Sequence, residues 1–502
     1  MKTVLLTAFL GVLIGGNGAS AATLPNSPNI LYLLCDDLGY GDVSALNPDR
    51  GKIHTPNIDQ LTREGMTFTD AHSSSSVCTP TRYDLLTGRY AWRTRLQHGV
   101  LQGTSPPLIA PGRMTVASLL RQNGYATAAI GKWHLGLAMN ENRWSDSITD
   151  GPLQHGFDRF FGISASLDMP PFAYIEGDHF SELPTTRKTW VRTGPAAPGF
   201  EAIDVLPTLT KKAAEYLRKR AMSRKPFFLY VALTSPHTPI VPGPQWVGKS
   251  GLSPYGDFVM QTDAAVGEIV AALHEAGLDD STMVCFASDN GCSPAAKVAE
   301  LEAKGHFPSA GFRGYKADIW EGGHRIPLIV RWPGVAKAGT RSDQTVCLGD
   351  LIATCADMLG VKLPDNAAED SVSLLPVLRG VDGGRPVHEA CVQHSVDGRF
   401  ALRQGPWKLE FCAGSGGWSA PRDPAAVKAK LPPIQLYALT NDPAETKNLA
   451  AEHPDVVKRM QALLEHYIDD GRSTPGAPQK NDVGIDLWKT SAATRSAPPA
   501  AE

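Results

Sequence analysis

The stretch Asn29-Ile-Leu-Tyr-Leu-Leu-Cys35 is a nearly continuous apolar run that ends at the acidic pair Asp36-Asp37. A second run, Met283-Val-Cys-Phe-Ala287, ends at Ser288-Asp289-Asn290-Gly291. Short apolar runs that are bounded by turn residues are typical of strands buried on both faces of a parallel sheet. The two runs therefore predict parallel strands that carry polar side chains at their carboxyl ends.

Two further apolar runs follow the same design. Residues 226–233 lead to Ser235-Pro236-His237, and residues 126–130 lead to Gly131-Lys132-Trp133-His134. Helical patterns precede three of the four runs, over residues 116–123, 209–222 and 258–276. Because strands that alternate with helices form βαβ units, we expect an α/β fold with a large, mixed but mostly parallel sheet flanked by helices. In such sheets the ligand site lies beyond the carboxyl ends of the strands.

The C-terminal part has a different pattern. Residues 400–411 predict two short strands around a turn, residues 435–439 a further strand, and residues 454–468 an amphipathic helix. A chain of 502 residues also exceeds the usual limit for one core. We therefore expect a catalytic domain over 22–387 and a smaller α+β subdomain with an antiparallel sheet over 388–472. The tail, 473–502, is rich in Pro and Ala, and we expect it to be poorly ordered.

The N-terminus has the three parts of a secretory signal peptide. Lys2 gives a positive start, residues 4–14 are nearly all apolar, and Ala19-Ser20-Ala21 offers small residues for cleavage. We expect residues 1–21 to direct export to the periplasm or the extracellular space. No later stretch reaches about 18 consecutive apolar residues, so we expect no membrane insertion of the mature chain. The formal net charge of −3 argues against a nucleic-acid partner held by bulk charge.

Eight cysteines in an exported chain favour disulfides, although the connectivity cannot be deduced from sequence. Cys35 and Cys285 lie in apolar runs and are typical of small buried hydrophobic residues. Cys391 and Cys412 flank the expected hairpin and could pair.

The polar residues at the strand ends suggest a metal site. Asp36 and Asp37 repel each other and resist burial unless a cation lies between them, and Asp289 and Asn290 would add oxygen ligands. Carboxylates with one amide suit a hard cation, calcium before magnesium. The alternative is that both pairs only cap turns.

Cys78-Thr79-Pro80-Thr81-Arg82 is the most specific motif of the sequence. It follows the polar loop 73–76 and leads into residues 83–89, which predict the start of a helix. A nucleophile at a helix N-terminus gains from the positive end of the dipole, which also suits an anionic substrate. Arg82 would hold that anion or the nucleophile. Taken alone, the motif could equally be an ordinary loop cysteine.

Cys-Thr-Pro-Thr-Arg followed by Leu85-Leu-Thr-Gly-Arg89 closely resembles the signature of the type I, formylglycine-dependent sulfatases of the alkaline phosphatase superfamily. The resemblance is densest over residues 28–335 and is to arylsulfatase-like and N-acetylgalactosamine-sulfatase-like members. Thr81 departs from the family, which usually has Ser there. The further motifs that carry the resemblance are Gly131-Lys-Trp-His-Leu-Gly136, His155-Gly-Phe-Asp158, Ser235-Pro-His-Thr-Pro239, Ser288-Asp-Asn-Gly291, Gly314-Tyr-Lys316 and Glu321-Gly-Gly323.

The resemblance implies that Cys78 is oxidised to formylglycine (3-oxoalanine), whose hydrate offers one hydroxyl to attack sulfur and a second to expel sulfate. An unmodified thiol cannot do this. The partner that the resemblance implies is a formylglycine-generating or an anaerobic sulfatase-maturating enzyme.

The resemblance also implies a role for each site residue. One Ca²⁺ would be bound by Asp36, Asp37, Asp289, Asn290 and the modified Cys78. Arg82 and Lys132 would stabilise the diol and the sulfate oxygens, and His134 would take the proton of the second hydroxyl. His237 and Lys316 would bind sulfate and assist the leaving alcohol.

Five further residues are candidates for lining the pocket. They are His155, Ser166, Asp168, His324 and Arg325. For each of them a structural role is an equal alternative.

The resemblance implies a sulfatase that acts on one sugar at a chain end. We expect a galactose or N-acetylgalactosamine sulfate from mucin, glycosaminoglycan or algal glycan, by analogy with the family. The alternatives are a phosphonate or phosphate ester hydrolase of the same superfamily, and a binding protein that has kept the fold but lost the chemistry.

Overall fold

The computed structural model describes residues 27–489. The expected signal peptide, 1–21, lies outside the described residues, as does the end of the chain from residue 490. Between residues 27 and 489, no helix is long and apolar enough to cross a membrane.

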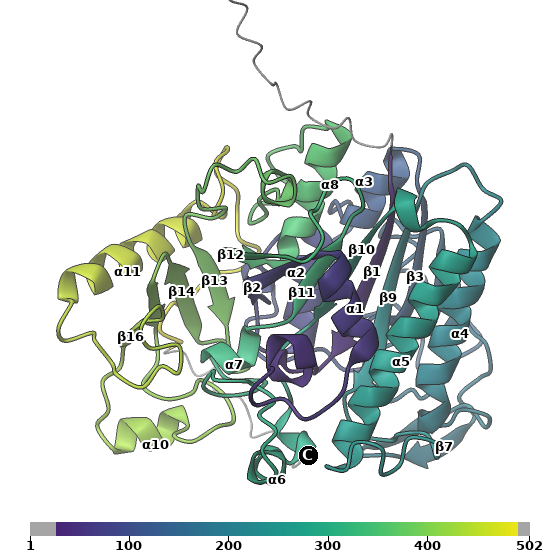
Figure 1. Cartoon of the computed structure of the whole chain (residues 1–502), viewed down its shortest axis with the longest axis horizontal. Coiled ribbons are helices and arrows are strands. Elements are labelled where there is room, and N and C mark those ends of the chain that lie inside the picture. The colour runs from purple at the N-terminus through teal and green to yellow at the C-terminus, as the bar shows by residue number, and fades with distance from the viewer. Residues whose placement is uncertain (1–26, 490–502) are drawn as a thin grey trace, which may run out of the picture.

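A ten-stranded sheet forms the centre of the larger part of the molecule (Figure 1). Five neighbouring strands, in the order β10-β1-β9-β3-β4, are parallel, which confirms the expected parallel sheet. The remaining strands extend it on both sides, so the sheet is mixed. In spatial order its strands are β12 (Thr340–Cys347), β2 (Met66–His72), β11 (Leu328–Arg331), β10 (Thr282–Ser288), β1 (Asn29–Asp36), β9 (Phe227–Pro236), β3 (Ala126–Lys132), β4 (Arg159–Ile163), β5 (Ile175–Glu176) and β6 (His179–Phe180).

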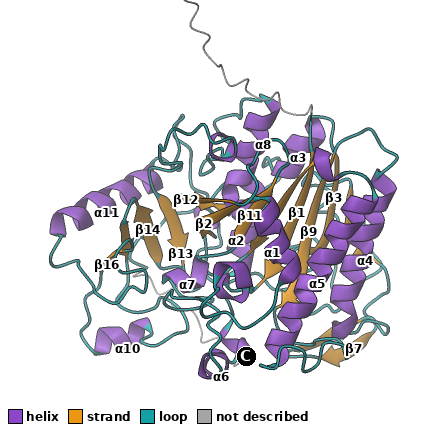
Figure 2. Ribbon diagram, in the orientation of Figure 1, coloured by secondary structure: helices purple, strands orange, loops and turns teal. Residues whose placement is uncertain are grey.

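The four central strands are those that the apolar runs predicted. β1, β9 and β10 are buried along almost their whole length, as expected for strands covered on both faces. In Figure 2 the helices α1, α4 and α5 cross in front of the sheet, and α5 packs against both α1 and α4. A second group, α2, α3 and α8, is also packed together.

The helices have the following bounds. They are α1 (Pro56–Glu64), α2 (Cys78–Thr87), α3 (Val116–Gln122), α4 (Ala202–Arg220), α5 (Pro254–Glu275), α6 (Val298–Ala303), α7 (Glu321–His324), α8 (Leu351–Leu359), α9 (Leu375–Leu378), α10 (Asp423–Lys428) and α11 (Pro454–Asp469). Short 3₁₀ turns cover Tyr40–Asp42, Ser44–Leu46, Ala91–Arg93, Asp279–Ser281, Pro294–Ala296 and Leu348–Asp350.

Two helices begin earlier than the sequence predicted. α2 begins at Cys78 rather than at Tyr83, and it contains the whole Cys78–Arg82 motif. Pro80 stands in its first turn, where a missing N–H costs no helical hydrogen bond. α4 begins at Ala202 rather than at Leu209, with Pro207 inside it.

The C-terminal part forms its own antiparallel sheet, as predicted, over a second apolar core to which Tyr90 and Trp92 also contribute. The order is β13 (Cys391–His394), β14 (Phe400–Gln404), β15 (Trp407–Glu410) and β16 (Gln435–Ala438). The helix α11 lies beside it in Figure 1. A small hairpin, β7 (Thr186–Thr189) and β8 (Thr193–Ala196), stands apart.

Two expectations for the C-terminal part are corrected. Residues 473–489 are not loose: Ser473 donates a hydrogen bond to Asp370, and Arg89 holds Asp482 at 3.0 Å. Cys391 and Cys412 do not pair. Cys391 is aligned with Arg403, near the C-terminal end of β14. Cys412 follows Phe411, whose backbone N–H donates to the carbonyl of Phe400 at the opposite end of β14. Cys35 and Cys285 are buried, as expected.

Candidate active site

The parallel strands bring their polar ends to one edge of the large sheet. Asp36 ends β1, Asp289 follows β10, His237 follows β9, and Lys132 ends β3. Cys78, at the first position of α2, faces the same place. One ligand atom each of Asp36, Cys78 and Asp289 lies within 4.8 Å of the others. The segments that the sequence predicted to converge therefore do so.

Cationic side chains neutralise the two carboxylates nearest to Cys78. Lys132 Nζ donates to both oxygens of Asp36, at 2.9 and 2.8 Å. Arg82 donates through Nε and Nη2 to Asp289 Oδ2, at 3.1 and 2.7 Å, and its Nη2 lies 3.4 Å from Asp36. All four side chains are buried, so each charge depends on the others rather than on water.

A second group completes the pocket. Lys316 Nζ donates to Asp37 Oδ2 at 2.8 Å and to His237 Nε2 at 3.1 Å. His237 Nδ1 donates to the Thr238 carbonyl at 2.7 Å, so Nε2 is the acceptor of the Lys316 hydrogen bond. Lys316 and His237 are thus joined by a hydrogen bond beside Asp37, with Lys316 as the donor.

Asn290 offers an oxygen that no protein group uses. Its Nδ2 donates to Asp37 Oδ1 at 2.7 Å, but its buried Oδ1 has no hydrogen-bond partner among residues 27–489. A buried acceptor without a partner is costly, and a cation would satisfy it. With the three aspartates, this oxygen makes a donor set that fits a hard divalent cation.

Burial and charge pull the pKa values of the two acids in opposite directions. Burial alone would raise the pKa of Asp36, but Lys132, His237 and Arg82 hold it well below its usual range. At Asp289 burial prevails over Arg82 and raises the pKa to about 6. The Asp289 carboxylate is therefore easier to protonate than the Asp36 carboxylate.

The Cys78 thiol is a poor nucleophile as it stands. It is 2% exposed, and burial raises its pKa despite the nearby lysines, so it stays protonated near neutral pH. Thr81, the departure from the family motif, is held by its hydroxyl, which donates to the carbonyls of Ser75 and Val77 at 3.0 and 3.1 Å.

His134 is a buried neutral base. Its Nε2 donates to the Leu101 carbonyl at 2.7 Å, and its Nδ1 has no partner in the described part of the chain. Burial and the charge of Lys132 lower its pKa well below the usual range. The free electron pair of Nδ1 can therefore accept a proton.

Two residues of this pocket have a strained backbone conformation. Asp37 and His134 have φ values of 65° and 57°, a region that non-glycine residues rarely occupy. Gly131, before Lys132, has φ 119°, and a Cβ there would lie 1.8 Å from the Ala232 carbonyl oxygen. Such strain is retained where the fold must fix functional side chains.

Two of the five candidate lining residues lie near the pocket. Asp168 is buried without a hydrogen-bond partner within residues 27–489, although its carboxylate lies 3.9 Å from His237 Nδ1 and 3.3 Å from Arg192. Ser166, two residues earlier, is also buried, and its hydroxyl has no partner there either.

The other three candidates contact framework groups, which agrees with the structural alternative for them. His155 lies 2.8 Å from Asp150 and stacks on Trp133. His324 contacts His72 Nδ1 at 3.0 Å, and Arg325 pairs with Asp70 and Glu321. Glu321, which lies near both His324 and Arg325, also pairs with the buried Lys408, so these two side chains belong to a buried network of charges.

Sequence reasoning missed two residues at the rim. Arg192 comes from the β7–β8 turn and pairs with Asp168. Trp418 comes from the C-terminal part, and its ring centre lies 5.8 Å from Lys316 Nζ. In the sequence, only the glycine-rich loop before Trp418 hinted at a functional role for this residue. No short sequence pattern relates residue 418 to residue 316.

A family model described as Sulfatase matches residues 28–361. Among curated proteins, the chain is 33% identical over 490 residues to an N-acetylgalactosamine-6-O-sulfatase of Bacteroides thetaiotaomicron, covering 87% of this chain and 92% of the relative. It is 34% identical over 492 residues to arylsulfatase A of Bos taurus, covering 92% of each chain.

Solved structures share the fold. One, described under the metabolism of multiple glycosaminoglycans by Bacteroides thetaiotaomicron, has a TM-score of 0.79 and 31% identity, covering 88% of this chain and 99% of its own. Another, a sulfatase from Pseudoalteromonas, has a TM-score of 0.69 and 25% identity, covering 88% and 90%.

Proposed function

The chain belongs to the sulfatase family of sulfuric ester hydrolases, in the alkaline phosphatase-like superfamily, and we propose that it releases sulfate from a sulfated carbohydrate. The observation that carries the proposal is the meeting of Cys78 with two carboxylates inside a ring of cationic side chains. Negative charge develops on the oxygens around sulfur as the ester bond breaks, so fixed cations stabilise the transition state.

We propose a galactose or N-acetylgalactosamine sulfate as the substrate, with N-acetylgalactosamine 6-sulfate at a chain end first. The support is the similarity to a bacterial relative named for that sugar and position, and to mammalian enzymes named N-acetylgalactosamine-6-sulfatase. Mucins, glycosaminoglycans and algal glycans carry such sugars. Asp168 and Arg192 would offer an acceptor and a donor to sugar hydroxyls.

We propose that the enzyme works with formylglycine at residue 78 and one calcium ion. Asp36, Asp37, Asp289 and Asn290, with the modified residue 78, would hold the ion. When bound, calcium would supply a fixed positive charge beside the sulfate oxygens, and formylglycine would supply a hydrated aldehyde as nucleophile. The unpaired Asn290 oxygen and the protonated state of the buried thiol support both assignments.

The protein groups would orient the reactants and move protons. Lys132 and Arg82 fix the Asp36 and Asp289 carboxylates and place positive charge next to the sulfate. His134 Nδ1 would accept the proton whose removal permits sulfate release. The proton between Lys316 and His237 would pass to the oxygen of the leaving alcohol.

Export and maturation are part of the same proposal. A signal peptide at residues 1–21 would direct the chain to the periplasm or beyond the cell. A formylglycine-generating or an anaerobic sulfatase-maturating enzyme would oxidise Cys78.

The substrate is tested by comparing kcat/KM for the 6-sulfate and 4-sulfate of N-acetylgalactosamine, galactose 6-sulfate, and an aryl sulfate with its matching aryl phosphate. We expect the N-acetylgalactosamine 6-sulfate to be preferred and the aryl phosphate to be much slower than the aryl sulfate. A preference for another sugar sulfate would overturn only the sugar assignment. A strong preference for phosphate would overturn the proposed reaction.

The cofactors are tested on protein from the native host. Mass spectrometry of the peptide around residue 78 should show the mass of formylglycine or its hydrate instead of cysteine. Chelation should lower activity and added calcium should restore it. Active enzyme with an unmodified Cys78 peptide would contradict the proposed nucleophile, and activity that neither chelator nor calcium changes would contradict the proposed ion.

A further inference from the structure

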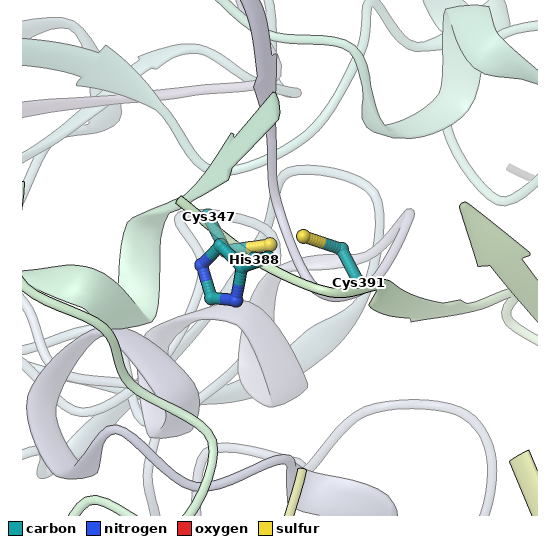
Figure 3. Close-up of side chains that lie close together, drawn as sticks. All are labelled: Cys347, His388 and Cys391. Atoms are coloured by element: carbon teal, nitrogen blue, oxygen red, sulfur yellow. The ribbon is translucent and has the colours of Figure 1, made fainter. Parts of the chain in front are cut away.

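Three potential metal ligands meet far from Cys78 in the sequence, at the junction of the two sheets. Cys347 ends β12 at the edge of the large sheet, Cys391 begins β13 at the edge of the small sheet, and His388 lies in the connection between them. One ligand atom of each lies within 4.8 Å of the others. Figure 3 shows the two sulfur atoms turned toward each other with the imidazole beside them. All three side chains are buried.

A carboxylate fixes the orientation of the histidine. His388 Nε2 lies 2.9 and 2.8 Å from the two oxygens of Asp350. The same carboxylate accepts hydrogen bonds from the backbone N–H groups of Cys347, at 2.8 Å, and Val372, at 2.9 Å. Asp350 is therefore held from three sides. A histidine that binds a metal through one ring nitrogen usually donates the N–H of its other ring nitrogen to a carboxylate, which fixes the orientation of the ring.

We propose that Cys347, His388 and Cys391 bind a transition-metal ion, zinc by preference, at a site separate from the calcium site. Two thiolates and one imidazole are soft to borderline ligands, which select zinc over calcium. The same three residue types hold zinc elsewhere in a tetrahedral arrangement whose fourth position is filled by water.

Charge and contact support the site. The ligand atoms of Cys347, His388 and Cys391 already lie within 4.8 Å of one another without an ion. The charges of a divalent ion and two thiolates cancel, which removes the cost of buried thiolate charge.

A neighbouring cavity gives the ion a route of entry. It has a volume of about 500 Å³, and both His388 and Cys391 line it. Asp343 and Glu389 also line it and would attract a cation, whereas the lining residue Asp70 is already paired with Arg325 and Arg403. Water in the cavity would supply the fourth ligand.

The ion would join the two parts of the molecule. Cys347 leads directly into the Leu348–Asp350 turn and α8, whereas Cys391 is aligned with Arg403 in the small sheet. The backbone of β13 in turn contacts the loop before Cys78, because His394 exchanges hydrogen bonds with Ser74 and Ser76. A bound metal would therefore stabilise the position of the small sheet against the catalytic part.

The test uses full-length Cys78→Ala protein, in which the thiol nearest to the calcium site is absent. Its zinc content is measured directly after purification. Bound metal is then removed with 1,10-phenanthroline and cobalt(II) is titrated in. We expect about one zinc per chain, and one cobalt that gives a strong sulfur-to-metal charge-transfer absorption. Adding Cys391→Ser or His388→Asn should abolish or shift that absorption and raise the cobalt dissociation constant at least tenfold.

Cys412→Ser is the matched control. Cys412 is also buried in the C-terminal part, and its sulfur donates to the Gly414 carbonyl and accepts from Gln435, so its loss should leave the cobalt absorption unchanged. Circular dichroism identifies any variant that fails to fold, and the metal content of the Cys78→Ala protein still decides the question. Absence of both zinc and the cobalt absorption would overturn the proposal. So would a Cys347–Cys391 disulfide found by mass spectrometry of unreduced peptides.

Discussion

The pocket around Cys78 and the Cys347–His388–Cys391 cluster both gather ligands in buried space, but they balance charge differently. In the pocket, Arg82 and Lys132 already neutralise the carboxylates. In the cluster only one histidine faces two sulfurs, with Asp350 behind it. A catalytic pocket must accept and release an anion at each turnover, so it needs fixed cations of its own. A cluster that only holds an ion can leave charge compensation to that ion.

Replacing one cysteine in each region should separate the two roles most strongly. We expect Cys78→Ala to lower kcat/KM by at least about 10⁴-fold, because no group remains to attack sulfur. Cys391→Ser should leave kcat/KM nearly unchanged while lowering the midpoint of thermal unfolding. Steady-state assays and thermal scans on both variants decide this. Retained activity in the Cys78 variant would remove the nucleophile assignment.

Lys132→Met removes one fixed cation while keeping the length of the side chain. We expect kcat to fall by about 10²–10³-fold, since an electrostatic stabiliser of the transition state is lost. The midpoint of thermal unfolding should also fall, because Asp36 loses its partner in a buried site. Lys297→Met, at an exposed site, is the control and should change neither quantity. A normal kcat in the Lys132 variant would contradict its role.

Acid should weaken the contact between the two regions through His394. Burial, with Lys489 and His98 adding to it, lowers the pKa of His394 to about 3. Between that value and the usual 6.5, the unfolded chain binds one proton more than the folded chain, so stability falls as pH decreases across this window. We expect His394→Gln to reduce the loss of unfolding free energy between pH 7 and 4 by up to about 3 kcal/mol.

Denaturant unfolding at several pH values measures this effect. His54→Gln, at an exposed site, should leave the pH profile unchanged. An equally steep profile in the His394 variant would show that other groups cause the loss at low pH.

The central part of the fold could be predicted because its signals are local. Each of the four apolar runs became a strand of the large sheet, and each ended close to the predicted polar residues. The carboxyl ends of parallel strands must meet at one edge, so Asp36, Lys132, His237 and Asp289 could be placed together without coordinates. The sulfatase signature at Cys78 identified the nucleophile position of the same site.

The edges of the fold could not be predicted in this way. β2, β11 and β12 pair in a mixed order that depends on long-range packing, and no local pattern specifies it. The expected pairing of Cys391 with Cys412 was wrong because flanking a hairpin in sequence does not bring two side chains to the same end of a sheet. His324 and Arg325 carried the right chemistry but joined a structural network instead.

The sequence by itself determined the parallel sheet, the polar residues at its carboxyl edge and the sulfatase signature, because strand periodicity and the switch-point rule act within short segments. Only the tertiary structure decided that Trp418 stands beside Lys316 and that Cys347, His388 and Cys391 meet. Those contacts join segments of two different sheets, and their relative position is set by the packing of whole layers rather than by any pattern within one segment.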